Sequence, residues 1–199
     1  MQGTFFEFKK EKSIEGSQIK FEGVEEKDVY NITAPFVVDG NRYLAGRVES
    51  HETTKDVQTV FFIEKDGVWQ PDTTLPIFQL EDPFVTHING EVIFGGVETY
   101  PTYDEKNKEI TGYKMVLYKG ENLNKLEQFA VGPEKMKDIR LIELPNREIG
   151  VFTRPQGEIG GRGKIGFIKI NSLNQITPDL LLHAPLLEGQ FTDKEWGGV

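Results

Sequence analysis

Residues 77–98 read IFQLEDPFVTHINGEVIFGGVE, and this stretch decides the fold because its pattern occurs three times along the chain. The other copies are residues 29–49, VYNITAPFVVDGNRYLAGRVE, and residues 136–154, MKDIRLIELPNREIGVFTR. Each copy has a polar or acidic head, an apolar strand, a turn, a second apolar strand and a charged tail. The head and tail residues lie 16 positions apart in every copy: Asn31 and Arg47, Asp82 and Glu98, Asp138 and Arg154. A strand-rich unit that recurs at roughly 50 residues is typical of a β-propeller, in which each sheet forms one blade.

The rest of the sequence also favours strands over helices. Short β-branched and aromatic runs bounded by Gly, Asn, Asp and Pro are frequent, and Asp-Gly or Asn-Gly pairs at 39–40, 66–67 and 89–90 predict tight hairpin turns. We therefore predict an all-β propeller with four-stranded blades, of which this chain holds about three plus edge strands. The predicted units are N-terminal edge strands in 1–28, blades in 29–75, 76–132 and 136–185, and the start of a further blade in 186–199.

Four smaller segments carry predictions of their own. We expect strands at 18–21 and 180–183, where apolar and polar residues are mixed over four positions. The polar segment 100–112, YPTYDEKNKEITG, predicts an exposed loop. The glycine-rich segment 156–163, QGEIGGRG, is better interpreted as a flexible hairpin connection than as a phosphate-binding loop, because no helix follows it to supply an N-terminal dipole.

The composition of the chain excludes several classes of protein. Its formal net charge of -9 argues against a nucleic-acid partner, because such proteins present clustered Lys and Arg. The absence of cysteine excludes disulfides, and no apolar run is long enough for a membrane span, so we expect a cytoplasmic protein without a membrane partner. His51, His87 and His183 are scattered, so no metal site is predicted. Because 199 residues are too few for five blades, we expect a truncated chain or fragment whose uncovered sheet edge could support a homo-oligomer.

Five short motifs in order give the chain a resemblance to a known family. They are Tyr30-Asn31, residues 43–49 (YLAGRVE), Glu81-Asp82-Pro83, Lys137-Asp138 and Arg154, with a weaker echo at 196–198 (WGG). In this order they resemble the five-bladed propeller family of glycoside phosphorylases and hydrolases that act on β-mannosides. They are most similar to an uncharacterised bacterial and protozoal branch of it, a related domain of unknown function.

The resemblance implies roles for particular residues. Asp82 takes the place of the family's proton donor, and four residues fall where the family binds phosphate or sugar hydroxyls: Asn31, Arg47, Lys137 and Arg154. The chain departs from the family at two places, because Phe84 stands where the family usually has Arg after Glu-Asp-Pro, and Thr153 stands where a His commonly precedes the third-repeat Arg. These departures weaken the case for phosphorolysis and favour hydrolysis or sugar binding.

The chemistry of glycoside cleavage identifies further candidates. The reaction needs a carboxylic acid at the leaving oxygen and a second group on the opposite face of the sugar. Glu49, Glu98 and Asp138 are candidate partner carboxylates for Asp82. The alternatives remain open: Asp82 could end a strand in an Asx-type turn before Pro83, and Glu49 could form a plain salt bridge with Arg47, two residues away on one strand face.

Three functional hypotheses follow. The favoured hypothesis is an enzyme, a glycosidase or glycoside phosphorylase that acts on a β-linked mannoside-type oligosaccharide with Asp82 as general acid. Its partner is a small carbohydrate, it needs no bound cofactor, and inorganic phosphate could be a co-substrate. The second hypothesis is a sugar-binding or scaffolding propeller without catalysis, and the third is an oligomeric β-sandwich in which the repeats are coincidental.

Overall fold

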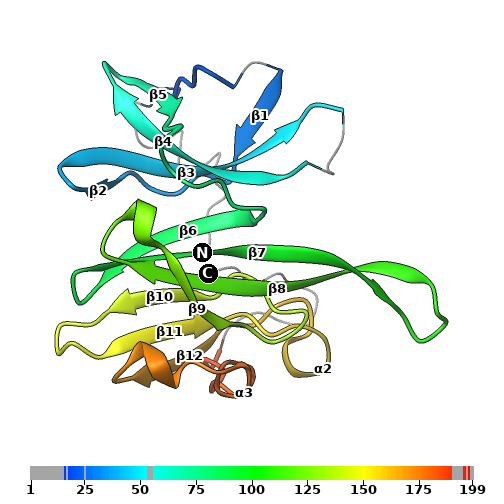
Figure 1. The fold of residues 1–199 in the computed structure, drawn as a ribbon. Helices are drawn as coiled ribbons and strands as arrows, with labels where there is room; N and C mark the ends of the chain where they lie inside the picture. The colour runs from blue at the N-terminus through cyan, green and yellow to red at the C-terminus, as the bar shows by residue number, and fades with distance from the viewer. Residues whose placement is uncertain are drawn as a thin grey trace, which may run out of the picture.

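The computed structural model describes residues 16, 18–24, 26–52, 56–189, 195 and 197. Three antiparallel sheets follow one another from the N-terminal to the C-terminal part of the chain (Figure 1). The first sheet contains β1 (Lys27–Tyr30), β2 (Phe36–Val38), β3 (Asn41–Ser50), β4 (Gln58–Lys65) and β5 (Val68–Pro71). The second contains β6 (Glu81–Ile88), β7 (Glu91–Tyr103), β8 (Glu109–Gly120) and β9 (Glu127–Val131). The third contains β10 (Arg140–Glu143), β11 (Ile149–Thr153) and β12 (Gly166–Ile170).

Local turn chemistry explains the hairpins. Asp39, Asp66 and Asn89 all have positive φ, and so does the glycine that follows each of them. Two successive residues with positive φ form the type I′ turn that matches the twist of paired strands, and Asn, Asp and Gly tolerate this conformation best. The predicted turns at 39–40, 66–67 and 89–90 are therefore confirmed.

The middle sheet is buried on both faces. Phe94 on β7 packs with Ala45 and Phe61 of the first sheet, whereas its neighbour Ile93 packs with Ile149 and the rest of the third sheet. Adjacent residues of a strand point to opposite faces, so β7 carries an unbroken apolar run. Sheets that pack face to face in series give a propeller-like all-β fold, and three such sheets are not the two-sheet sandwich of the third hypothesis.

Two predicted strands are absent from the structure. Residues 180–183 are not a strand, because α3 (Pro178–Leu182) forms there, with the Thr177 hydroxyl accepting from the backbone N–H of Leu180. Thr followed by Pro is a helix start signal. Residues 18–21 are not a strand either, since Phe21 forms only an isolated bridge to Trp69.

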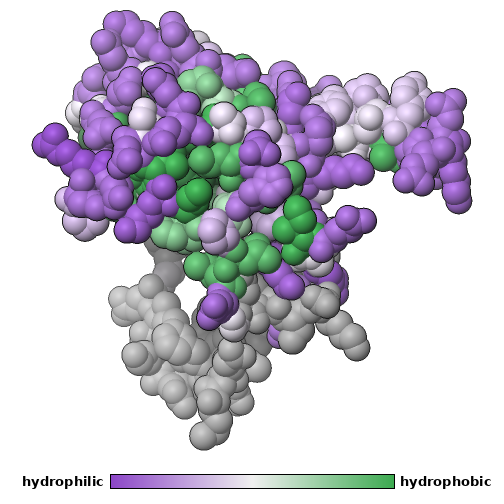
Figure 2. All heavy atoms as spheres, turned by 90° about the horizontal axis from the view of Figure 1, so that it is seen from below, coloured by the Kyte–Doolittle hydropathy of each residue, from purple (hydrophilic) through white to green (hydrophobic). Residues whose placement is uncertain are grey.

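The expected loop at 100–112 is also wrong, because β7 and β8 stay paired as far as Tyr103 and Glu109. Only the tip turns, where the Asp104 carboxylate accepts the backbone N–H groups of Lys106 and Lys108. Alternating Thr, Tyr and Ile residues in this segment suit a strand better than a loop. The hairpin extends from the body of the molecule and ends in hydrophilic residues (Figure 2).

Some other segments contain short helical turns. The connection between β11 and β12 contains α2 (Gly157–Gly160), so the segment 156–163 joins a hairpin as predicted but contains a helical turn. The other two are the 3-10 turns η1 (Leu123–Lys125) and η2 (Leu173–Gln175). The predicted edge strands before residue 16, together with Trp196 and Gly198, lie outside the described residues. In the described part of the chain, no helix is long and apolar enough to cross a membrane.

Candidate functional site

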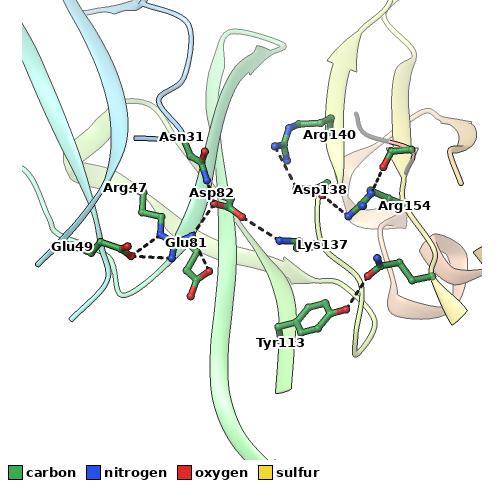
Figure 3. Close-up of polar contacts among 12 residues, drawn as sticks. Asn31, Arg47, Glu49, Glu81, Asp82, Tyr113, Lys137, Asp138, Arg140 and Arg154 are labelled. Carbon is green, nitrogen blue, oxygen red and sulfur yellow. Dashed lines mark hydrogen bonds and ion pairs between the residues drawn. The ribbon is translucent and has the colours of Figure 1, made fainter. Parts of the chain in front are cut away.

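A pocket of about 430 Å³ opens where the three sheets meet. Its lining combines residues from all three sequence repeats: Asn31, Ile32, Asp82, Pro83, Lys137, Asp138, Arg140 and Arg154. Figure 3 shows these polar side chains converging from separate sheets. This volume suits a small ligand such as a sugar with an attached or neighbouring anion.

The head residue of each repeat has the same unusual backbone conformation. Asn31, Asp82 and Asp138 have φ values of 49°, 48° and 61°. This left-handed conformation is disfavoured for most side chains but tolerated by Asn and Asp. At Asp82 it coincides with an irregularity in the pairing of β6 with β7, between Glu81 and Phe84. The repeat therefore positions three short polar side chains at equivalent points around one pocket.

Asp82 lies at the centre of the polar contacts. Its Oδ1 accepts a hydrogen bond of 2.5 Å from Asn31 Nδ2 and lies 3.3 Å from a guanidinium nitrogen of Arg47, while its Oδ2 lies 3.4 Å from Lys137 Nζ. Burial raises the pKa of Asp82, but the hydrogen bond from Asn31 and the charges of Lys137 and Arg47 outweigh burial and hold it below its ordinary value. Asp82 is therefore ionised at neutral pH in the unliganded protein.

Arg47 stands behind Asp82, outside the pocket lining. Its guanidinium lies 2.9 Å from Glu49, 3.2 Å from Glu81 and 3.3 Å from Asp82, and it stacks 5.1 Å from the ring centre of Tyr30. Glu49 is buried, and this burial, followed by the charges of Glu81, Asp28 and Asp82, raises its pKa. Arg47 thus neutralises a group of carboxylates and fixes the orientation of Asp82.

The third repeat supplies a second ionic cluster. The Arg154 side chain is only 6% exposed, and its guanidinium lies 2.9 Å from the Asp138 carboxylate and donates to the carbonyl of Gly197. Arg140 approaches the other Asp138 oxygen at 3.9 Å. The pocket lining carries three cations, Lys137, Arg140 and Arg154, against two carboxylates, Asp82 and Asp138. This local excess of positive charge, in a chain of net charge -9, suits an anionic ligand.

The sequence candidates occupy three kinds of place. Asn31, Asp82, Lys137, Asp138 and Arg154 line the pocket, whereas Arg47 and Glu49 form the layer behind it. Glu98 lies outside the lining, is 45% exposed and pairs with Lys114 at 3.4 Å. Arg140 was not among the predicted site residues, although its position two residues after Asp138 could have indicated a shared face.

The fold and the pocket define a propeller-like all-β protein with an anion-compatible site where its sheets meet. The chain belongs to the DUF1861 family, described as a protein of unknown function, whose family model matches residues 6–199. Among curated proteins, no sequence matches this chain.

Three solved structures resemble this chain over 98% of its length. MPT-4, a mannose phosphorylase from Leishmania mexicana determined in complex with a phosphate ion, is 34% identical with a TM-score of 0.84. MPT-1, a GDP-Man-dependent mannosyltransferase from the same organism, is 31% identical with a TM-score of 0.80. A hypothetical protein from Leishmania major is 31% identical with a TM-score of 0.81. The chain spans 59%, 60% and 61% of these three proteins, respectively.

Proposed function

We propose that the protein cleaves a β-linked mannoside with inorganic phosphate. The phosphate oxygen forms a bond to the anomeric carbon, the glycosidic bond breaks, and Asp82 gives its proton to the departing sugar oxygen. Hydrogen phosphate brings one proton and the departing sugar oxygen takes one, so the products are the mannose 1-phosphate dianion and the shortened sugar, and Asp82 ends in the protonation state in which it began. The observation that carries this proposal is the Asp82 carboxylate, 3.4 Å from Lys137, in a pocket whose lining holds three cations against two carboxylates.

The ionised state of Asp82 at neutral pH fits an ordered reaction. A phosphate dianion bound by Lys137 and the neighbouring guanidiniums would form ion pairs with the positive charge that now stabilises the Asp82 carboxylate. It would also place negative charge close to that carboxylate, and a nearby like charge raises the pKa of a carboxylic acid. Asp82 would therefore become a proton donor only once phosphate is bound. Protonation of the departing sugar oxygen would then be limited to the complex that contains phosphate.

The similar proteins support phosphate-linked mannose chemistry. MPT-4 is a mannose phosphorylase that holds a phosphate ion, and MPT-1 is a GDP-Man-dependent mannosyltransferase. Phosphorolysis and transfer from a nucleotide sugar both move a mannosyl group between a phosphate oxygen and a sugar hydroxyl. Mannosyl transfer is therefore the second candidate function.

The test is to incubate the protein with β-linked mannobiose, with and without phosphate, and to follow mannose 1-phosphate by phosphorus NMR. We expect the product only with phosphate, and we expect Asp82→Asn to lower the rate by about 100–10,000-fold, the usual contribution of a general acid. Release of mannose at the same rate without phosphate would replace phosphorolysis by hydrolysis. Binding without turnover would favour the sugar-binding hypothesis, and turnover only with GDP-mannose would favour mannosyl transfer.

A further inference from the structure

We infer that Arg140, which lies over the ring of Phe84, is a further phosphate-binding residue of this pocket. The inference rests on the proposed function only for the identity of the anion. Arg140 is the first residue of β10 and lines the pocket from the third sheet, while Phe84 lies on β6 of the second sheet. Figure 3 shows the contact between the Arg140 side chain and Asp138.

Phe84 is a fixed platform for Arg140. The Arg140 guanidinium carbon lies 5.1 Å from the centre of the Phe84 ring, within the range of a cation–π contact. Phe84 is itself 6% exposed, and it occupies the space left by the missing side chain of Gly95 on β7, where an added Cβ would lie 2.3 Å from the ring. Because the ring cannot move easily, it offers the Arg140 guanidinium a fixed aromatic surface.

Arg140 has more hydrogen-bond donors than the surrounding protein uses. A guanidinium carries five N–H groups. Among the described residues, Arg140 donates to the Ile139 carbonyl at 3.1 Å and lies 3.9 Å from Asp138, which is beyond hydrogen-bond distance. Its side chain is only 27% exposed, so water has limited access to the remaining donors. A partly buried guanidinium with unused donors is suited to an anion with several acceptor oxygens.

The position of Arg140 also connects the pocket with a second hollow. This hollow of about 350 Å³ is lined by Phe84, Thr86 and Ile142 on the far side of Arg140, and it shares Ile32, Pro83 and Arg140 with the main pocket. Arg140 therefore forms a boundary between a charged pocket and a more apolar space. A phosphate group bound by Arg140 would sit at that boundary.

The same chemistry could recognise free inorganic phosphate or the phosphate group of mannose 1-phosphate. The test measures the binding of each compound separately by calorimetry to the wild-type chain, Arg140→Gln, Arg140→Lys and Phe84→Leu. Loss of charge-assisted hydrogen bonds should weaken binding about 10–100-fold in Arg140→Gln and less in Arg140→Lys. Phe84→Leu keeps the charge but removes the aromatic platform, and we expect a loss of about 2–5-fold.

Arg42→Gln is the matched control, because Arg42 also stacks on an aromatic ring, that of Trp69 at 5.7 Å, but lies outside the pocket lining. This control should bind both compounds as the wild type does. Weaker binding of inorganic phosphate and mannose 1-phosphate in the Arg140 variants supports the inference, and an effect on one compound alone identifies that compound as the source of the phosphate group. If Arg140→Gln does not fold, Arg140→Lys and Phe84→Leu carry the test.

Two further outcomes separate this inference from the proposed function. If Arg140 variants lose phosphate affinity while the wild type never turns over a mannoside, the phosphate-binding role stands and phosphorolysis is wrong. If folded Arg140 variants bind both compounds with wild-type affinity, or if the wild type binds neither compound, the role of Arg140 is wrong.

Discussion

Replacing Arg154 with Met should destabilise the whole protein, because Arg154 connects the third sheet to the pocket through a buried ion pair. The Arg154 side chain is 6% exposed and that of Asp138 is 21% exposed, with 2.9 Å between the charged atoms. Removing one partner of a buried pair leaves the other charge desolvated, which costs roughly 3–5 kcal/mol. The partial exposure of Asp138 and the second guanidinium at 3.9 Å place the expected loss near the lower end, about 3 kcal/mol.

For a chain of this size, such a loss corresponds to a fall in Tm of roughly 6–12 °C. Calorimetry of the wild type, Arg154→Met, Asp138→Asn and the double variant gives the pair energy as a double-mutant cycle. The double variant should be more stable than Arg154→Met alone, because no desolvated carboxylate remains. If the Tm of Arg154→Met lies within about 2 °C of the wild type, the stability has changed by less than about 1 kcal/mol and this account of the cluster is wrong. Strictly additive effects in the double-mutant cycle would also refute it.

Four other predictions follow from the site and its support. Gly95→Ala should cost about 1–3 kcal/mol in the free energy of unfolding, because its new Cβ would overlap the Phe84 ring; urea titration measures this, and an unchanged midpoint would contradict it. Glu98→Gln should leave mannoside turnover within about 2-fold of wild type, because the half-exposed Glu98 pairs with Lys114 outside the pocket lining, and a larger loss would give Glu98 a role in the reaction. Thr153→Val should raise the free energy of unfolding by up to about 1 kcal/mol, because the buried Thr153 hydroxyl has no hydrogen-bond partner in the described structure. A clear fall in the thermal unfolding temperature would instead show that the hydroxyl has a partner. The folded-state pKa of Asp82 is lowered, so the ionised carboxylate contributes its full stabilisation above about pH 4 and loses it as the pH falls through the folded-state pKa. Asp82→Asn should therefore flatten the acidic side of a plot of the free energy of unfolding against pH. An acidic side identical to that of the wild type would rule this out.

The sequence predicts those parts of the fold that depend on neighbouring residues. Asp-Gly and Asn-Gly pairs specify the hairpin turns because the required positive φ is a local property. The projecting hairpin shows the limit of this reasoning: its charged residues suggested a loop, but cross-strand pairing as far as Tyr103 and Glu109 decided its conformation. The helix at 178–182 was missed even though the Thr177-Pro178 signal was present in the sequence.

The candidate site depends on contacts between sheets. The equal spacing of the repeats relates Asn31, Asp82 and Asp138, and the structure places all three in the pocket lining. Their catalytic and binding roles remain predictions. The same spacing would also group Glu98 with Arg47 and Arg154, but β7 continues outward at that point and Glu98 pairs with Lys114. The stacking of Arg140 on Phe84 joins two different sheets, so no local pattern could have revealed it.

The most direct measurement is a carbon NMR titration of the Asp82 side-chain carboxyl group, performed on the folded protein with and without saturating phosphate. The account predicts a pKa below the ordinary value in the empty pocket and a clear rise when phosphate binds, because the anion engages Lys137 and adds like charge beside the carboxylate. Superimposable titration curves, or a further fall in the pKa with phosphate, would contradict the account.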